Sequence, residues 1–411
     1  MSKKSLSKKY VKMDQIKHVL QRPNMYIGSI ELDEYNTWIY DEKNNEMKKK
    51  KIKFVPGLYK IFDELVVNIL DHSKRLEKTK YPITKIKIDI DTDENKIVVY
   101  NDGEGIEIEK HPEHDIYIPE LIFGNMLTSS NYDEKEEKEI GGMNGIGAKA
   151  CNIFSKKFII ETVDIDKKKK YKQVFEENMS IKNKPSIKTY DKYPYTKITF
   201  YPDLEKFNLK NLSKDFISLM KKRCYDLCAL TDNKVKVFLN SDKISITDFK
   251  NYSQFYLKDY KSEEIFYHKF NTKSEIVISY NKNGSGLEHI SFVNGIWTIK
   301  GGKHVDNIVQ QIIKGITEHI TKKNKDIKIK PQFIKDNLII FLKSTIINPA
   351  FDSQTKDYLT TPVSKFGIKM EIPDSFIKKL MNSELVERIY QLSNNLLEKN
   401  LKKTDGKKKN T

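Results

Sequence analysis

Four glycines within seven positions are the residues whose types and spacing best suit a chemical role. They lie in the run Gly-Gly-Met-Asn-Gly-Ile-Gly-Ala-Lys at residues 141–149. Glycine lets backbone N–H groups approach an anion without an intervening Cβ, and a helix that begins after such a run adds free N–H donors. Lys149 adds an ammonium group in its first turn. The pattern favours a cradle for phosphate groups, and a flexible turn before a buried helix is the alternative.

The same run departs from the P-loop of nucleotide-binding proteins in two ways. A charged stretch at 133–139 precedes it where a P-loop has an apolar strand, and no serine or threonine follows Lys149 to hold magnesium. If a nucleotide binds at this run, its metal ligand and its catalytic base must therefore come from other parts of the chain.

A helix predicted over residues 56–72 offers candidates for both roles. Glu64 and Asn68 are four positions apart and project from one helix face, and Asp71 and His72 extend this polar stripe. A solvated stripe is the alternative, but the apolar content of the helix favours a stripe that faces a cleft. The apolar residues that recur at helical spacing are Leu58, Ile61, Phe62, Leu65, Val66 and Ile69.

A third polar motif follows two predicted antiparallel strands, at 85–90 and 96–100. The second strand runs directly into Asn-Asp-Gly-Glu-Gly at 101–105, where a polar pair and two glycines at a strand end can let a nucleobase approach the backbone. A plain turn is the alternative for this motif taken alone. Also predicted are a helix at 121–131, strands of one antiparallel sheet at 158–163, 171–175 and 197–201, and a long helix at 216–230.

The patterns divide the chain near residue 245. We predict an N-terminal arm and a first domain with the candidate phosphate cradle at 1–245, a second domain at 246–400 and a basic, disordered tail at 401–411. The second domain is predicted to contain strands at 275–280, 290–294 and 338–342, a helix at about 305–320, a polar loop at 348–357 and a helical stretch at 373–401.

The composition limits the classes of protein to consider. The 411 residues suffice for two or three domains with sizeable cores. A net charge of +17 favours an anionic partner such as nucleic acid, although lysines spread over a solvated surface would give the same charge. Three cysteines cannot form a disulfide framework and indicate a reducing compartment. No apolar run approaches the roughly 18 residues of a membrane span, so no membrane partner is expected.

Together, these motifs resemble a known family. Glu64 with Asn68, the motif at 101–105 and the glycine run resemble the motifs of GHKL nucleotide-binding domains. Four longer stretches narrow the resemblance to the ATPase region of eukaryotic-type DNA topoisomerase II. They are R-P-N-M-Y-I-G-S at 22–29, F-V-P-G-L-Y-K-I-F-D-E at 54–64, L-T-S-S-N-Y at 127–132 and F-D-S-Q-T-K at 351–356. The resemblance covers residues 10 to 400, approximately.

The resemblance implies an α+β chain. Its first domain would be a GHKL (Bergerat-type) ATPase sandwich of a mixed sheet and helices, and its second a transducer domain with an α+β layer like that of ribosomal protein S5. Other GHKL ATPases, such as mismatch-repair proteins and heat-shock chaperones, share Glu64, Asn68 and the glycines. They lack the Q-T-K and L-T-S-S-N-Y motifs. A catalytically silent module that binds DNA or dimerises is a third reading.

The resemblance also implies a role for each motif, with ATP and Mg²⁺ as cofactors. Glu64 would be the general base that activates the attacking water, Asn68 would coordinate magnesium, and Asn101 would contact adenine. Gln354 and Lys356 of the second domain would reach the γ-phosphate. The other implied nucleotide contacts are Tyr26 (in an arm passed to the partner subunit), His72, Ser129, Ser130, Asn131, Gly142, Met143, Asn144, Gly145, Ile146, Gly147, Ala148, Lys149 and Thr355.

Two of these positions depart from the family's usual residues. His72 stands where the family often has asparagine, and Met143 stands where it often has arginine. Neither position is the base, the metal ligand or the γ-phosphate lysine, so ATP hydrolysis is expected to survive both changes.

The implied partners are duplex DNA and a second copy of the chain, which ATP would close into a homodimer. Thr321, Lys322 and Lys323 align with a segment that touches DNA in relatives, and a solvated helix end is the alternative. A full-length enzyme would continue into C-terminal cleavage domains, whose acidic metal-binding motif and tyrosine-bearing winged helix are not recognisable in this sequence. We therefore expect ATP hydrolysis and dimerisation without DNA cleavage, in the nucleus or at a viral replication site.

Overall fold

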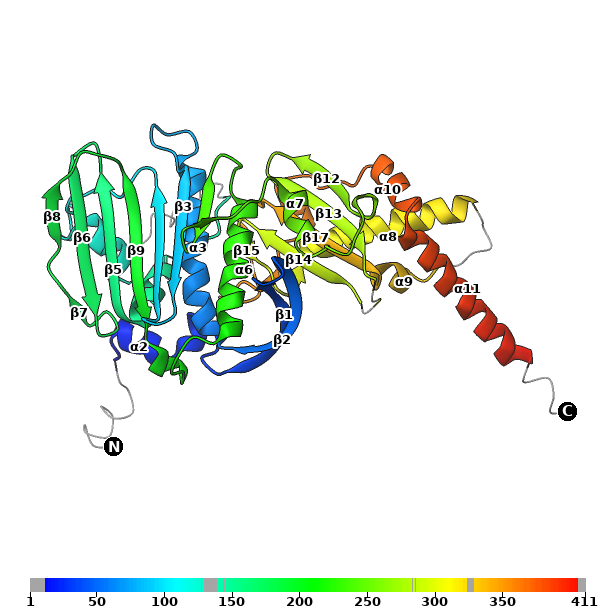
Figure 1. Cartoon of the computed structure of the whole chain (residues 1–411), viewed down its shortest axis with the longest axis horizontal. Helices are drawn as coiled ribbons and strands as arrows, with labels where there is room; N and C mark the ends of the chain where they lie inside the picture. Colours follow the sequence, from blue (N-terminus) through cyan, green and yellow to red (C-terminus); the bar gives the residue numbers. More distant parts are fainter. Residues whose placement is uncertain are drawn as a thin grey trace. The chain divides into compact units, whose positions relative to one another are not determined.

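The structure is a computed structural model of the chain (Figure 1). It describes residues 12–126, 128, 139–142, 145–282, 284, 286–323 and 329–405, with side chains in the last helix described as far as residue 395. Contacts within the chain divide it into two compact units. The first ends at Asp248 and the second begins at Phe249, and Glu139 is grouped with the second.

A nine-stranded sheet is the framework of the first unit. Its strands are β3 (Lys85–Asp91), β4 (Lys96–Asp102), β5 (Ser155–Asp164), β6 (Lys169–Glu176), β7 (Ile181–Lys182), β8 (Ser186–Thr189), β9 (Tyr195–Pro202), β10 (Lys236–Leu239) and β11 (Asp242–Lys243). The order is β11-β10-β3-β4-β9-β5-β6-β7, and β8 also pairs with β6. Only β10 and β3 pair in parallel. Burial alternates along β3 and β4 because one face of the sheet lies against helices.

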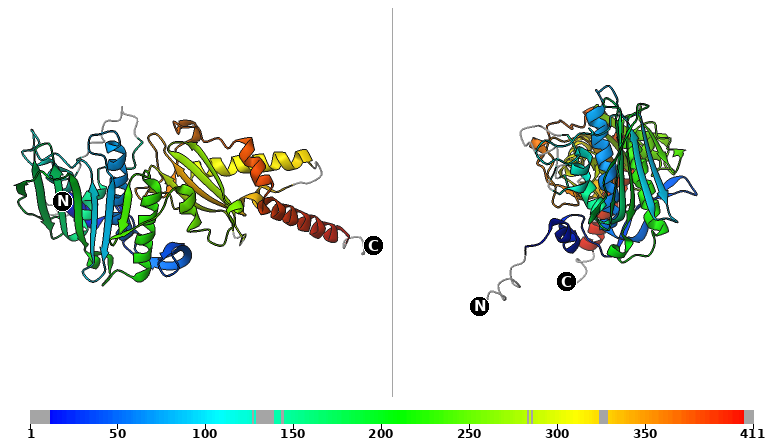
Figure 2. Two further views of the ribbon diagram at one scale, coloured as in Figure 1. Left: turned by 45° about the horizontal axis from the view of Figure 1, so that its top comes forward. Right: turned by 90° about the vertical axis from the view of Figure 1, so that its left-hand side faces the viewer.

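The helices of the first unit are α2 (Gln15–Gln21), α3 (Pro56–Leu76), α4 (Ile118–Gly124), α5 (Gly147–Ile153) and α6 (Lys214–Leu230). Helix α3 contacts β4, and α4 and α5 contact β5 (Figures 1 and 2). Helix α6 packs on α3 and on a hairpin of β1 (Asp33–Asp41) and β2 (Glu46–Phe54). Pro56 occupies the first turn of α3, where its missing N–H costs no hydrogen bond. This arrangement places α3 beside α5, which follows the glycine run.

The second unit is built around a mixed five-stranded sheet. The strands are β12 (Phe266–Asn271), β13 (Ser274–Tyr280), β14 (Glu288–Val293), β15 (Ile296–Trp297) and β17 (Leu338–Ser344), in the order β12-β13-β17-β14-β15. Its helices are α7 (Phe249–Gln254), α8 (Lys303–Lys323), α9 (Pro331–Lys335), α10 (Asp374–Met381) and α11 (Glu384–Asp405). The apolar face of α8 is buried in one core with β13, β17 and α10. Both units mix helices and strands, so the predicted α+β class is confirmed.

The largest differences from the predicted helices concern two stretches. The helix predicted over 121–131 is α4, which begins at Ile118 and ends at Gly124, because the next residue, Asn125, is extended. The helical stretch predicted at 373–401 is two helices, interrupted at Asn382 and Ser383. The second of them, α11, continues to Asp405, into the segment predicted to be a disordered tail.

Within the described ranges, no helix combines the length and the apolarity that crossing a membrane requires.

Candidate active site

The described residues 141, 142 and 145–147, here called the glycine segment, pass directly over the polar face of α3. A Cβ at Gly147 would lie 2.1 Å from Oε2 of Glu64, too close for any side chain. A Cβ at Gly142 would lie 3.4 Å from Oδ1 of Asn68 and 3.2 Å from Oδ2 of Asp71. The two motifs that the sequence presents separately therefore form one site, and at Gly147 the backbone lies too close to Glu64 for any side chain.

Asp71 anchors the glycine segment to α3. Its Oδ1 accepts the backbone N–H of Gly141 at 2.9 Å, and its Oδ2 accepts that of Gly142 at 2.7 Å. Burial raises the pKa of Asp71, while these two N–H donors lower it in part. Asp71 belongs to the predicted polar stripe without a predicted role of its own, and in the structure it fixes where the glycine segment begins.

Lys149 anchors the other end of the glycine segment. Its ammonium group donates to the carbonyl oxygens of Gly145 at 2.6 Å and Thr128 at 2.7 Å. The residue is buried, and this burial lowers the pKa of Lys149 to about 8. In this structure Lys149 thus binds backbone carbonyls, and its contact with a phosphate stays a prediction.

A series of paired, buried charged side chains orients Glu64. Its Oε1 lies 2.7 Å from Nζ of Lys60, one turn earlier on α3, and this nitrogen is 3.8 Å from Oδ2 of Asp63. Oδ1 of Asp63 in turn lies 2.6 Å from Nε of Arg223 on α6. All four side chains are buried, and buried charges are tolerated only when they are paired. The pairing with Lys60 directs Oε1 away from the glycine segment and leaves Oε2 facing it.

The predicted adenine contact, Asn101, is buried at the end of β4, where its amide donates to the carbonyl of the next residue at 2.8 Å. The turn that follows is held against α3, since Nε2 of His72 lies 2.9 Å from the carbonyl oxygen of Glu104. Burial lowers the pKa of His72, which favours the neutral ring. Gly105 must be glycine, because a Cβ there would lie 2.1 Å from the Val163 carbonyl oxygen. Nucleotide contacts of Asn101 and His72 stay predictions.

Tyr26 lies in a segment that packs on the N-terminal end of α3. The N–H of Gly57 donates to the carbonyl of Ser29 at 2.8 Å, which ties this segment to the first turn of the helix. The Tyr26 hydroxyl lies 2.9 Å from Nδ1 of His18 on α2. In the single chain, Tyr26 therefore has an intramolecular partner, and its contact with a nucleotide of a partner subunit stays a prediction.

Gln354, Thr355 and Lys356 lie together in a turn of the second unit, just before β18 (Tyr358–Leu359). Lys356 has a φ of 63° and is buried. Strand β18 pairs in parallel with β16 (Gly301–Gly302), and the Tyr358 hydroxyl donates to Oδ2 of Asp306 on α8 at 3.1 Å. The turn is therefore fixed to the start of α8.

The remaining predicted site residues fall into three groups. Ile146 and Ala148 flank Gly147 at the beginning of α5. Thr321, Lys322 and Lys323 form the exposed last turn of α8, so the predicted DNA contact begins on a helix end. The predicted nucleotide contacts Ser129, Ser130, Asn131, Met143 and Asn144 lie outside the described residues.

Two protein-family models match the chain. Residues 55–205 match the family described as histidine kinase-, DNA gyrase B-, and HSP90-like ATPase. Residues 236–410 match the family described as DNA gyrase B. The first match contains α3 and the glycine segment.

Solved structures define the relationship more closely. The crystal structure of the ATPase region of Saccharomyces cerevisiae topoisomerase II is 45% identical and has a TM-score of 0.88, over 95% of this chain and all of that one. The chain belongs to the family of topoisomerase II ATPase regions. The ATPase and transducer domains of Balamuthia mandrillaris topoisomerase II are 36% identical, with a TM-score of 0.89 over 97% of this chain and all of that one. The GHKL and transducer assignments are thereby confirmed.

Full-length relatives of the family are much longer than this chain. DNA topoisomerase 2 of Saccharomyces cerevisiae is 44% identical over 98% of the chain, which spans 29% of that protein. DNA topoisomerase 2 of Acanthamoeba polyphaga mimivirus is also 44% identical over 98% of the chain, which spans 32% of it. The likeness therefore concerns the ATPase part of these enzymes.

The contact between the glycine segment and α3 gives a first testable prediction. Gly147→Ala should reduce ATP turnover by about 100-fold or more, because the new methyl group would occupy the position of Glu64 Oε2 and displace the carboxylate that is the predicted general base. Gly142→Ala is the matched control: its methyl would lie 3.2 Å from the nearest atom, a contact that small shifts can relieve, so its loss should be several-fold smaller. Steady-state phosphate release measures both, and equal losses would contradict the close approach at Gly147.

Proposed function

We propose that this chain is the ATP-operated gate of a type II DNA topoisomerase. ATP binding closes two copies of the chain around a DNA duplex, and hydrolysis drives strand passage and reopening of the gate. The cleavage of DNA is assigned to C-terminal domains of the full-length enzyme. The place of action is the nucleus, or a viral replication site if the chain comes from a virus.

The observation that carries this proposal is the glycine segment lying over Glu64 and Asn68. The N–H groups of Gly141 and Gly142 already bind Asp71, so the donors offered to an anion are those at the beginning of α5. The carboxylate and amide beneath the segment supply a base and a hard oxygen ligand. These groups suit a triphosphate whose terminal phosphoryl is attacked by water, since phosphoryl transfer depends chiefly on positioning and charge stabilisation. A fold that only bound DNA would require none of these groups.

In the proposed reaction, Glu64 accepts a proton from water through the oxygen that faces the glycine segment. The water oxygen then bonds to the γ-phosphorus as the bond to the β-phosphate oxygen breaks, which gives ADP and phosphate. The buried pair with Lys60 orients the Glu64 carboxylate before the reaction, so the carboxylate need not reorganise during it. The proposed γ-phosphate contacts, Gln354 and Lys356, would stabilise the charge that develops.

Mg²⁺ fits the proposed site. The Asn68 amide oxygen is a hard ligand on the helix face that the glycine segment covers. Because this ligand is a neutral amide, the Glu64 carboxylate is not needed to bind the metal and can act as the base. When bound, the ion would neutralise charge on the phosphates.

Substitutions at the exposed end of α8 test whether DNA is a partner of the chain. Lys322→Glu together with Lys323→Glu should abolish most of the stimulation of ATP turnover by duplex DNA and leave DNA-free turnover within about twofold of the parent chain. Lysine contacts with phosphates act through charge alone, so the remaining stimulation should also depend less on salt. The measurement is steady-state turnover against DNA concentration at two salt concentrations.

A second charge-reversal pair controls for the change in net charge. Lys184 and Lys192 are exposed lysines of the first unit, and their double change to glutamate should leave stimulation by DNA intact. Loss of stimulation in both pairs would assign the effect to overall charge.

The proposed dimer predicts that ATP turnover of the parent chain rises more steeply than linearly with protein concentration. A linear rise would contradict the gate.

A further inference from the structure

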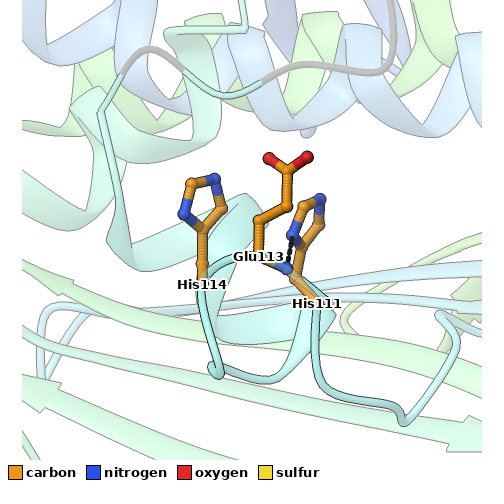
Figure 3. Close-up of side chains that lie close together, drawn as sticks. All are labelled: His111, Glu113 and His114. Carbon is orange, nitrogen blue, oxygen red and sulfur yellow. Dashed lines mark hydrogen bonds between the residues drawn. The ribbon is translucent and has the colours of Figure 1, made fainter.

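A turn between β4 and α4 gathers two imidazoles and a carboxylate at one point. His111, Glu113 and His114 each offer one ligand atom, and these atoms all lie within 4.8 Å of one another. Figure 3 shows the three side chains projecting to the same side of the turn. The rings of the two histidines stack, with centroids 4.7 Å apart and an interplanar angle of 24°. None of these residues belongs to the nucleotide site described above.

Backbone hydrogen bonds within the turn contribute to its shape. The N–H of Asp115 donates to the carbonyl of His111 at 3.0 Å, and the N–H of His111 donates to the carbonyl of Ile116 at 2.8 Å. Lys110 and Tyr117 pair as an isolated β-bridge at its base. The three ligating side chains are therefore brought together by hydrogen bonds that a bound ion need not supply.

We propose that His111, Glu113 and His114 form a binding site for Zn²⁺, with the fourth position open to water. Two imidazoles and one carboxylate are a common ligand set for Zn²⁺, whereas Mg²⁺ prefers oxygen ligands alone. Tetrahedral Zn²⁺ with Zn–N bonds of about 2.0–2.1 Å sets its ligand atoms about 3.4 Å apart. Each separation must therefore close by at most about 1.4 Å, which rotation of the exposed Glu113 and His114 side chains and of the half-buried His111 ring can provide.

The ring nitrogens and the local charge are both compatible with a cation. Nδ1 of His111 accepts a single hydrogen bond from the backbone N–H of Glu113, at 3.2 Å. A rotation of the His111 ring that breaks this hydrogen bond makes the lone pair of Nδ1 available to a metal. The surrounding stretch from Glu104 to Asp115 contains five acidic residues and one lysine, in a chain whose net charge is +17. The negative charge of this stretch attracts a divalent cation, whereas the positive net charge of the whole chain repels one.

Calorimetric titration of the whole chain with zinc chloride tests the site. One ion should bind per chain, and His111→Ala, Glu113→Gln and His114→Ala should each weaken binding by at least about tenfold. His268→Ala removes a histidine of β12 in the second unit, and zinc should bind this control as it binds the parent. No one-to-one binding, or parent-like binding in all three variants of the turn, would overturn the proposal.

Cobalt replacement tests the coordination independently of affinity. Co²⁺ in a four-coordinate site absorbs visible light far more strongly than the hydrated six-coordinate ion. We expect this absorption in the parent chain, its removal by Zn²⁺ and its persistence in excess Mg²⁺. Its absence in the parent chain, or its persistence in His114→Ala, would contradict the site. Circular dichroism confirms that the surface variants fold.

Discussion

Glu64→Gln is expected to lower ATP turnover by about 10²–10⁴-fold, the range typical for loss of a general base, and to leave ATP affinity within about twofold of the parent chain. Glutamine keeps the shape of the side chain but cannot accept the proton of the attacking water. Because Glu64 is proposed to act on water and not on the nucleotide, binding should survive. Steady-state phosphate release and calorimetric titration with ATP measure the two quantities separately.

The fold should tolerate this substitution. Removing one member of a buried ion pair usually destabilises a protein by about 3–5 kcal/mol, because the partner charge is left uncompensated. Here Nζ of Lys60 also lies 3.8 Å from Oδ2 of Asp63, which remains after the change. We therefore expect a smaller effect on the thermal midpoint than Lys60→Met would give.

Glu77→Gln is the matched control, since Glu77 is an exposed carboxylate at the C-cap of the same helix. Its turnover should equal that of the parent chain. A parallel loss of ATP affinity and turnover in Glu64→Gln would show that Glu64 holds the nucleotide, and retained turnover would remove it from the reaction.

The elements that present the site could be predicted because their signals are local. The apolar spacing of 56–72 gives α3, which contains Glu64 and Asn68, and the alternation at 85–90 and 96–100 gives β3 and β4, with Asn101 near the end of β4. Local pattern also placed Glu64 and Asn68 on one face, and the structure turns that face toward the glycine segment. This much follows from the periods of helices and strands alone.

The contacts that position the site could not be predicted because they join distant residues. Asp71 and Gly141 are 70 residues apart, and Asp63 and Arg223 are 160 apart. Spacing within one element contains no information on which polar residue of a stripe will reach another segment. The four-residue spacing of Lys60 and Glu64 was available in the sequence, but it does not reveal that the pair is buried.

The helix predicted over 121–131 was wrong in its bounds, since the structure has a helix at Ile118–Gly124 and an extended Asn125 after it. Gly124 lies close to Phe175 of β6, where a Cβ would come within 2.6 Å of the ring. Such a contact between distant segments is not contained in the local preference of 121–131 for a helix. Asn125 then stabilises the helix end, because its amide donates to the Glu120 carbonyl at 3.1 Å.

The second large effect is expected from Lys356→Met, which should slow ATP turnover by roughly 10²–10³-fold, as loss of one donor to a developing charge does. Methionine keeps most of the buried aliphatic stem and removes the charge. The preference of the chain for ATP over ADP should also fall, because only ATP has the γ-phosphate that Lys356 is proposed to contact. Turnover and the affinities of both nucleotides are the measurements.

Lys369→Met controls for loss of a lysine, since Lys369 is an exposed residue of the same unit. It should change neither turnover nor nucleotide preference. Tyr358→Phe separates contact from positioning: it removes the hydrogen bond to Asp306 and keeps Lys356. A several-fold loss of turnover with an unchanged preference for ATP over ADP is expected for a residue that only positions the turn.

Combining Glu64→Gln with Lys356→Met tests whether the two residues act on one chemical step. Groups that work together on a single transition state are far from additive, because the second loss removes little once the first has disabled the step. The double variant should therefore be nearly as active as Glu64→Gln alone. Losses that multiply would instead place Lys356 at a separate step, such as closure of the dimer, which would limit turnover without touching the γ-phosphate.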